Sequence, residues 1–253
     1  MTAGTEMETV LITGAASGIG KATARRLAER MCVVIADRDG SAAHALAAEL
    51  KQAGRQVFAV QVDVSSRASV AAMMQVIDDA IGPVHALFSN AGINRRAPVE
   101  EITASDWDAM MQTHVKGAFL CAQAVVPGMR ARRCGAILTM SSDFAVLGFA
   151  GAAAYAAAKS AIYSLTKSLA LEFAADRIRV NALGPGPVDT PLLRSGRTPK
   201  QWQAVEARFV TNLPMHRLGR PDEIAAVADF LLSDRASYIT GQIVHPNGGQ
   251  LSW

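Results

Sequence analysis

The sequence predicts an α/β fold: one domain built on a doubly wound parallel sheet with helices on both faces. Short, almost continuously apolar runs rich in β-branched residues alternate with longer amphipathic runs, as expected for parallel strands that helices cover on both sides. The length of 253 residues is common for one α/β domain. A glycine-rich turn follows the first apolar run, which favours an open sheet over an eight-fold barrel.

The elements follow one another in alternation along the chain. Strands are expected at 9–13, 33–36, 57–62, 86–89, 136–140, 178–182 and 243–245. Helices are expected at 19–30, 42–52, 68–80, 104–132, 153–174 and 224–232. Right-handed crossovers then make the strands parallel. The segment 185–221 lacks strong periodicity and carries several prolines, so we expect a substrate lid at about 186–220 within a single domain spanning 1–253.

The composition excludes several classes of function. Half of the residues are hydrophobic and 19% are charged, which suits a large core and not a disordered chain. Lys and Arg number 25 against 22 Asp and Glu, so we expect no nucleic-acid partner. No apolar stretch is long enough to span a membrane, and the acidic N-terminal residues predict no secretory signal.

Cysteine and histidine usage predicts a cytoplasmic protein without a metal. Cys32, Cys121 and Cys134 form an odd set without Cys-x-x-Cys spacing, which fits buried, reduced thiols. The five histidines show no ligand spacing either.

The glycine-rich turn predicts a site for a phosphate-bearing ligand. The first strand leads directly into Thr13-Gly14-Ala15-Ala16-Ser17-Gly18-Ile19-Gly20, and a helix begins near Ile19. Glycines allow a tight turn and a close approach to a pyrophosphate, which then faces the positive end of the helix. The predicted contacts in this turn are Gly14, Ser17, Gly18, Ile19 and Gly20.

The acid that ends the second strand bears on the choice of cofactor. Asp37 follows Gly20 by 17 residues, about where a carboxylate that binds the adenosine ribose is expected. It would repel a 2′-phosphate, which favours NAD over NADP. Arg38 leaves three roles open: recognition of a 2′-phosphate, stacking on adenine, or exposure to water.

Three residues near the middle of the chain form a candidate catalytic set. Tyr155 and Lys159 are four residues apart in a predicted helix and so share a face, while Ser142 lies at the end of the preceding strand. Removing a proton from an alcohol as hydride leaves requires a base. Lowering the pKa of a tyrosine from about 10 to about 7 takes roughly 4 kcal/mol, a task for the ammonium of Lys159. Ser142 would hold the substrate oxygen beside Tyr155.

These motifs together resemble the short-chain dehydrogenase/reductase family. The spacing Thr-Gly-x-x-x-Gly-x-Gly and the set Ser142, Tyr155 and Lys159 carry the resemblance, which extends over nearly the whole chain. It implies a Rossmann fold, NAD(P)-dependent chemistry on CH–OH groups, and contact of Lys159 with the nicotinamide ribose. It also implies a homotetramer assembled through the helices 104–132 and 153–174 and the C-terminal strand.

Ser89 replaces the first Asn of the family's Asn-Asn-Ala-Gly signature, and a second departure lies in the predicted catalytic set. His114 stands where the family has an Asn whose backbone carbonyl holds a water in the proton relay. If only the carbonyl matters, His serves equally well. An imidazole that joins the relay and a histidine that is merely packed in the helix both remain open. His114 is therefore a candidate catalytic residue.

The resemblance implies further cofactor contacts on four loops. These are Asp63 and Val64 after the third strand, Asn90, Ala91 and Gly92 after the fourth, and Pro185, Val188 and Thr190 at the start of the lid, besides Tyr155 and Lys159. A helix-capping role for Asp63 remains open.

The substrate is expected to be a small alcohol or ketone. Phe144 and other apolar side chains of its loop, together with apolar side chains of the lid such as Phe209, would line its pocket with Ser142 and Tyr155; packing of Phe209 in an ordinary core remains open. The segment 90–96 resembles that of sugar-acid dehydrogenases, so Arg95 at the pocket mouth would bind a carboxylate or else be solvated. Arg96 is expected to be solvated. Three functions remain: an NAD-dependent dehydrogenase of secondary alcohols, an NADPH-dependent 3-oxoacyl thioester reductase, and a catalytically idle nucleotide-binding module.

Overall fold

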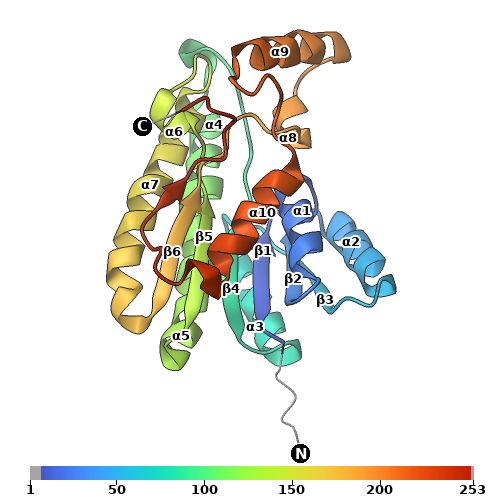
Figure 1. Cartoon of the computed structure of the whole chain (residues 1–253), viewed down its shortest axis with the longest axis vertical. Coiled ribbons are helices and arrows are strands. Elements are labelled where there is room, and N and C mark those ends of the chain that lie inside the picture. The colour runs from blue at the N-terminus through green and yellow to red at the C-terminus, as the bar shows by residue number, and fades with distance from the viewer. Residues whose placement is uncertain (1–6, 252–253) are drawn as a thin grey trace, which may run out of the picture.

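The computed structural model describes residues 7–251 and contains the predicted parallel sheet (Figure 1). Its strands are β1 (Thr9–Thr13), β2 (Cys32–Asp37), β3 (Val57–Gln61), β4 (Val84–Ser89), β5 (Gly135–Met140), β6 (Ile178–Leu183) and β7 (Ile243–Val244). They are ordered β3-β2-β1-β4-β5-β6-β7, and every neighbouring pair is parallel. Starting from β1, the chain adds β2 and β3 on one side and then β4 to β7 on the other. This change of side between β1 and β4 leaves a crevice at their carboxyl ends.

Helices cover both faces of the sheet, as predicted. They are α1 (Gly18–Leu27), α2 (Gly40–Gln52), α3 (Arg67–Ala80), α4 (Ala104–Met110), α5 (Gly117–Arg132), α6 (Phe144–Leu147), α7 (Ala153–Phe173), α8 (Pro191–Arg194), α9 (Pro199–Asn212) and α10 (Pro221–Leu232). One core lies beneath α1, α2 and α10, the other beneath α3, α5 and α7. Val10 and Ile12 enter the first core and Leu11 the second, which explains why the strands read as continuous apolar runs.

The helix predicted at 104–132 is divided in the structure. A π-helical turn, Met111–Lys116, joins α4 to α5 and contains His114. Such turns are frequent at functional sites and have no sequence period of their own, so the continuous apolar spacing concealed this one.

The predicted lid contains two helices, contrary to its weak periodicity. The side chains of Thr190 and Thr198 cap α8 and α9, and a proline follows each as the first helical residue, where its missing N–H costs nothing. The lid has a small core of its own, made of Leu193, Phe209, Leu213 and Leu218. In Figure 1 both helices lie beyond the carboxyl ends of the strands.

A narrow neck closes the base of the lid. The Gly219 N–H donates to the Pro187 carbonyl at 2.9 Å, and the Asp189 N–H donates to the Gly219 carbonyl at 2.9 Å. The chain therefore leaves and re-enters the domain at one point.

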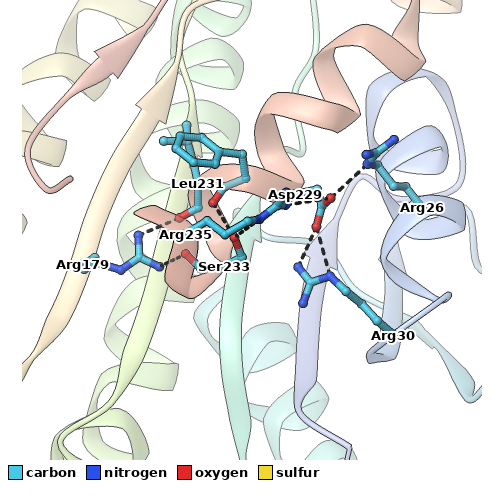
Figure 2. Close-up of polar contacts among 8 residues, drawn as sticks. Arg26, Arg30, Arg179, Asp229, Leu231, Ser233 and Arg235 are labelled. Atoms are coloured by element: carbon cyan, nitrogen blue, oxygen red, sulfur yellow. Dashed lines mark hydrogen bonds and ion pairs between the residues drawn. The ribbon is translucent and has the colours of Figure 1, made fainter. Parts of the chain in front are cut away.

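A carboxylate surrounded by arginines ties α1 to α10. Figure 2 shows Asp229 accepting from Arg26 at 3.1 Å, from Arg30 at 2.6 Å and from Arg235 at 3.2 Å. Burial acts to raise the pKa of Asp229, but the hydrogen bonds from Arg30 and Arg26 outweigh it and hold the pKa below its usual value. The helix that begins at the glycine turn is thus held against the helix that follows the lid.

Within residues 7–251, no helix is long and apolar enough to cross a membrane. Cys32 and Cys121 are buried, but Cys134 is exposed, because it lies in the turn between α5 and β5 and not inside either element.

Candidate active site

A cavity of about 440 Å³ opens at the carboxyl ends of the strands. It brings together the predicted cofactor, catalytic and substrate residues from both halves of the chain, with two exceptions, Gly20 and Arg95. The predicted residues that line it are Gly14, Ser17, Gly18, Ile19, Asp37, Arg38, Asp63, Val64, Asn90, Ala91, Gly92, His114, Ser142, Phe144, Tyr155, Lys159, Pro185, Val188 and Thr190.

The glycine turn is shaped to admit a phosphate group. Gly14 and Gly18 have φ of 64° and 51°, in the left-handed region that favours glycine. A Cβ on Gly20 would lie 2.2 Å from the Gly14 carbonyl oxygen, so this glycine allows close packing and does not line the cavity. Ser17, the N-cap of α1, makes no side-chain capping bond, which leaves first-turn N–H groups for an anion. The turn therefore fits the pyrophosphate of a dinucleotide.

Thr13 and Asn90 hold this turn against the end of β4. The Asn90 amide donates to the carbonyls of Thr13 and Gly14, both at 3.0 Å, and the Thr13 hydroxyl accepts from the backbone N–H groups of Asn90 and Ala91. Ser89, which replaces an Asn of the family pattern, remains paired within the sheet. The Asn90 side chain thus shapes the phosphate cradle, residues 14–20, through hydrogen bonds to backbone carbonyls.

The acidic residues at the far end of the cavity are held by local hydrogen bonds. The two oxygens of Asp37 accept from the backbone N–H groups of Ala16, at 2.9 Å, and Asp39, at 3.0 Å. Arg38 beside it is exposed. Asp63 accepts from the Ser65 hydroxyl and N–H, which lowers its pKa, and the cap of α3 is Ser66 rather than Asp63.

Ser142, Tyr155 and Lys159 face the same part of the cavity. Ser142 lies just beyond β5, and α7 carries the other two residues. The Lys159 ammonium is buried and donates to the Met140 carbonyl at 2.6 Å, while the Ser141 hydroxyl donates to the Lys159 carbonyl at 2.8 Å. These two bonds fix α7 against the end of β5. The Lys159 nitrogen lies 5.6 Å from the centre of the Tyr155 ring.

The expected lowering of the Tyr155 pKa is not found in the chain alone. Burial raises this pKa to about 12, and the nearby Ser142 hydroxyl offsets only part of that rise. Burial also lowers the pKa of Lys159 to about 7, so its positive charge, which was expected to stabilise a phenolate, is only partly present at neutral pH. At neutral pH the phenol is therefore protonated and suited to donate a proton to a ketone oxygen.

Asp143, which the sequence analysis did not single out, orients the Ser142 hydroxyl. Ser142 donates to the Asp143 carboxylate at 3.2 Å and accepts from the Phe144 N–H at 3.2 Å. One lone pair of the serine oxygen remains for a ligand. The other Asp143 oxygen is buried without a partner among the described residues, and burial raises the pKa of this carboxyl to about 6.

His114 is buried beside Tyr155, with their ring centres 5.5 Å apart. Its Nε2 lies 2.7 Å from the Ile93 carbonyl and donates to it, which leaves Nδ1 as an acceptor with no partner among the described residues. Burial and the nearby Lys159 charge lower the pKa of His114 well below its usual value. The imidazole is therefore neutral at physiological pH.

We expect His114→Asn to keep kcat within tenfold of the wild type. The backbone carbonyl at position 114, which the family pattern assigns to the relay, is retained, although the shorter Asn side chain gives up the bond from His114 to the Ile93 carbonyl. Steady-state kinetics at saturating cofactor test this. A larger loss of kcat would give the imidazole a role of its own.

The structure corrects the expectation for the two arginines after β4. Arg95 does not line the cavity: its side chain is 65% exposed and pairs with Asp106 at 3.2 Å, because Asp106 lies at the start of α4, outside the crevice. Arg96, expected to be solvated, lines the cavity instead. Its guanidinium lies over the rings of Phe144 and Phe149, at 5.5 and 5.3 Å from their centres.

The apolar wall of the cavity comes from both predicted sources. Phe144 stacks on Phe149 with ring centres 4.5 Å apart and lies edge-on to Tyr155 at 6.4 Å. From the lid come Leu192, Leu193 and Phe209. Phe209 also belongs to the lid core, so it serves both purposes.

Comparison with known proteins yields a consistent set of relatives. Residues 14–250 match a family model described as enoyl-(acyl carrier protein) reductase. A cis-4-hydroxycyclohexanecarboxylate dehydrogenase of Sinomonas cyclohexanicum is 39% identical over 94% of both chains. A 3-oxoacyl-[acyl-carrier-protein] reductase of Staphylococcus aureus is 37% identical over 96% of this chain and 97% of its own.

A solved structure shares the fold throughout. It is a gluconate 5-dehydrogenase from Burkholderia cenocepacia in complex with NADP and tartrate, with a TM-score of 0.90 and 34% identity over 96% of this chain and 94% of its own. These relatives are oxidoreductases that act on CH–OH or C=O groups, and the match covers the glycine turn as well as the catalytic set. The chain is therefore an NAD(P)-dependent oxidoreductase and belongs to the short-chain dehydrogenase/reductase family.

Proposed function

We propose that the protein interconverts a secondary alcohol and a ketone through Ser142, Tyr155 and Lys159. The observation that carries this proposal is that all three residues line the same cavity as the glycine turn, which is shaped to admit a phosphate group. Tyr155 exchanges the hydroxyl proton with the substrate, Ser142 holds the substrate oxygen, and Lys159 binds the cofactor ribose beside Tyr155. The nicotinamide, when bound, accepts or supplies the hydride.

We propose NAD as the preferred cofactor. Asp37 supports this, because its carboxylate is fixed at the adenosine end of the cavity by two backbone N–H groups and would repel a 2′-phosphate. NADP is the second candidate, favoured by the exposed Arg38 next to Asp37 and by the NADP in the gluconate 5-dehydrogenase structure.

A substrate panel with both cofactors tests the proposal. Secondary alcohols, hydroxycyclohexanecarboxylates, sugar acids and 3-hydroxyacyl thioesters are each followed through the absorbance of reduced cofactor. We expect turnover of a secondary alcohol with a higher kcat/KM for NAD than for NADP. Preference for a 3-oxoacyl thioester with NADPH would instead support the reductase named among the relatives. No turnover of any substrate with either cofactor would contradict the proposed activity.

We further propose that four copies of the chain assemble in the cytoplasm. Large apolar side chains are exposed on the helices expected to meet other subunits: Trp107 on α4, Phe119 on α5 and Leu171 on α7. Where such side chains adjoin in one patch, they favour contact with another chain.

A further inference from the structure

Arg96 lines the substrate end of the cavity, and its guanidinium is held there without an ion-pair partner among the described residues. Among residues 7–251, no carboxylate lies within 4 Å of it, whereas its neighbour Arg95 is paired with Asp106. The Nε atom of Arg96 is buried and makes no hydrogen bond with the described residues. A charged donor buried in this way is costly unless a ligand completes its hydrogen bonds.

The surroundings of Arg96 fix its direction. The two phenylalanine rings beneath it, Phe144 and Phe149, are stacked on each other and restrict the guanidinium through cation–π contacts. Both rings lie in the segment between Ser142 and Tyr155, so the position of the guanidinium relative to these catalytic residues is fixed. The side chain is thus pre-organised before any ligand binds.

The charges that face Arg96 come from three other segments. Asp143 and Tyr155 are close enough to act on it electrostatically, and Arg197 from the lid adds a second positive charge. Asp143 already accepts from Ser142 and is not within ion-pair distance of Arg96. Arg96 is therefore influenced by a second positive charge, Arg197, and by one carboxyl group, Asp143, whose pKa is raised to about 6.

We propose that Arg96 binds a carboxylate of the substrate, so that the preferred substrates are hydroxy acids or keto acids whose reacting carbon is separated from the carboxylate by an apolar spacer. This rests on the proposed function of the same site. The carboxylate would take the free donors of the guanidinium, the spacer would lie against Phe144, and the hydroxyl would reach Ser142 and Tyr155. A planar, charged donor pair suits a carboxylate better than a neutral group.

Matched acids and esters test this inference. The probes are 3-hydroxybutyrate, 4-hydroxypentanoate and 5-hydroxyhexanoate, each compared with its methyl ester, which keeps the spacer and removes the charge. We expect the wild type to prefer at least one acid over its ester in kcat/KM. In Arg96→Gln, that preference should fall at least 30-fold, mainly through KM, and Arg96→Lys should restore part of it. Arg95→Gln, next in the sequence but outside the cavity, should leave the preference unchanged.

The outcomes separate this inference from the proposed function. Equal losses for acid and ester in Arg96→Gln would mean that Arg96 acts on Tyr155 and not on a carboxylate, and would overturn the inference while leaving the activity intact. A wild type that turns over the esters as well as the acids, or better, would overturn it too. Absence of turnover for every acid and ester, and for the wider panel, would count against the proposed activity itself.

Discussion

Tyr155→Phe is expected to lower kcat about a thousand-fold, within the range that general acid–base groups contribute. The substitution removes only the phenolic hydroxyl, so the ring contacts with His114 and Phe144 remain. The proton of the substrate hydroxyl then has no group to receive or supply it. Steady-state kinetics measured in both directions would show the loss in kcat, with the dissociation constant of the cofactor changed little.

Tyr163→Phe is the matched control for this experiment. Tyr163 lies two turns further along α7, and its hydroxyl bonds to His245, away from the cavity. The same atom is removed from the same helix, and kcat should remain within a few-fold of the wild type. If Tyr155→Phe retained more than a tenth of the activity, the proton would have to pass through another group, and the proposed role of Tyr155 would be wrong.

Asp143→Asn is expected to stabilise the protein above pH 6. The folded state raises the pKa of Asp143 from 3.8 to about 6, so the folded chain holds this proton more tightly than the unfolded chain. Stability therefore falls as the pH rises from about 4 to about 6, and the loss is complete above the folded pKa. A shift of this size corresponds to about 2–3 kcal/mol at pH 8. Asn has no charged form, and its side-chain oxygen still accepts from Ser142.

Thermal unfolding at two pH values measures this effect. At pH 8 the Tm of Asp143→Asn should exceed that of the wild type by roughly 5 °C or more, since about 1 kcal/mol shifts Tm by 2–4 °C in a chain of this size. At pH 4 the two proteins should unfold at nearly the same temperature. Asp78→Asn, an exposed position on α3, is the control and should show no such dependence. An unchanged Tm at pH 8 would mean that Asp143 is not a buried, costly charge.

The sheet was predictable because every strand has the same requirement, an apolar side chain at nearly every position, and this requirement is visible in a few consecutive residues. Residues such as Leu11 and Ile35 are buried whichever face they enter, so each strand is a continuous apolar run. Glycine at positions 14 and 18 is tied to the left-handed backbone found there, and so the cradle was predictable too. The positions of Ser142, Tyr155 and Lys159 follow from the rule that parallel strands end at one edge.

The lid and the arginines were not predictable in the same way. The prolines at 191 and 199 suggested broken structure, although the Thr-Pro pairs and Gln201 form N-terminal capping signals that identify helices when read together. Arg95 and Arg96 lie in a segment without helix or strand, where no period decides which neighbour turns inward. No sequence pattern marks Asp143, because only its burial, which depends on the whole fold, makes it unusual.

The neck at Pro187, Asp189 and Gly219 makes the lid an exchangeable module. Since both ends of the lid are fastened at one point, its length can change without displacing the catalytic set or the cradle. Doubling such a loop costs only about 0.6 kcal/mol in closure entropy. Substrate preference can therefore diverge by insertion, deletion or replacement beyond Thr190 while the cofactor contacts and the catalytic set stay constant, so this segment is the place to introduce a new specificity.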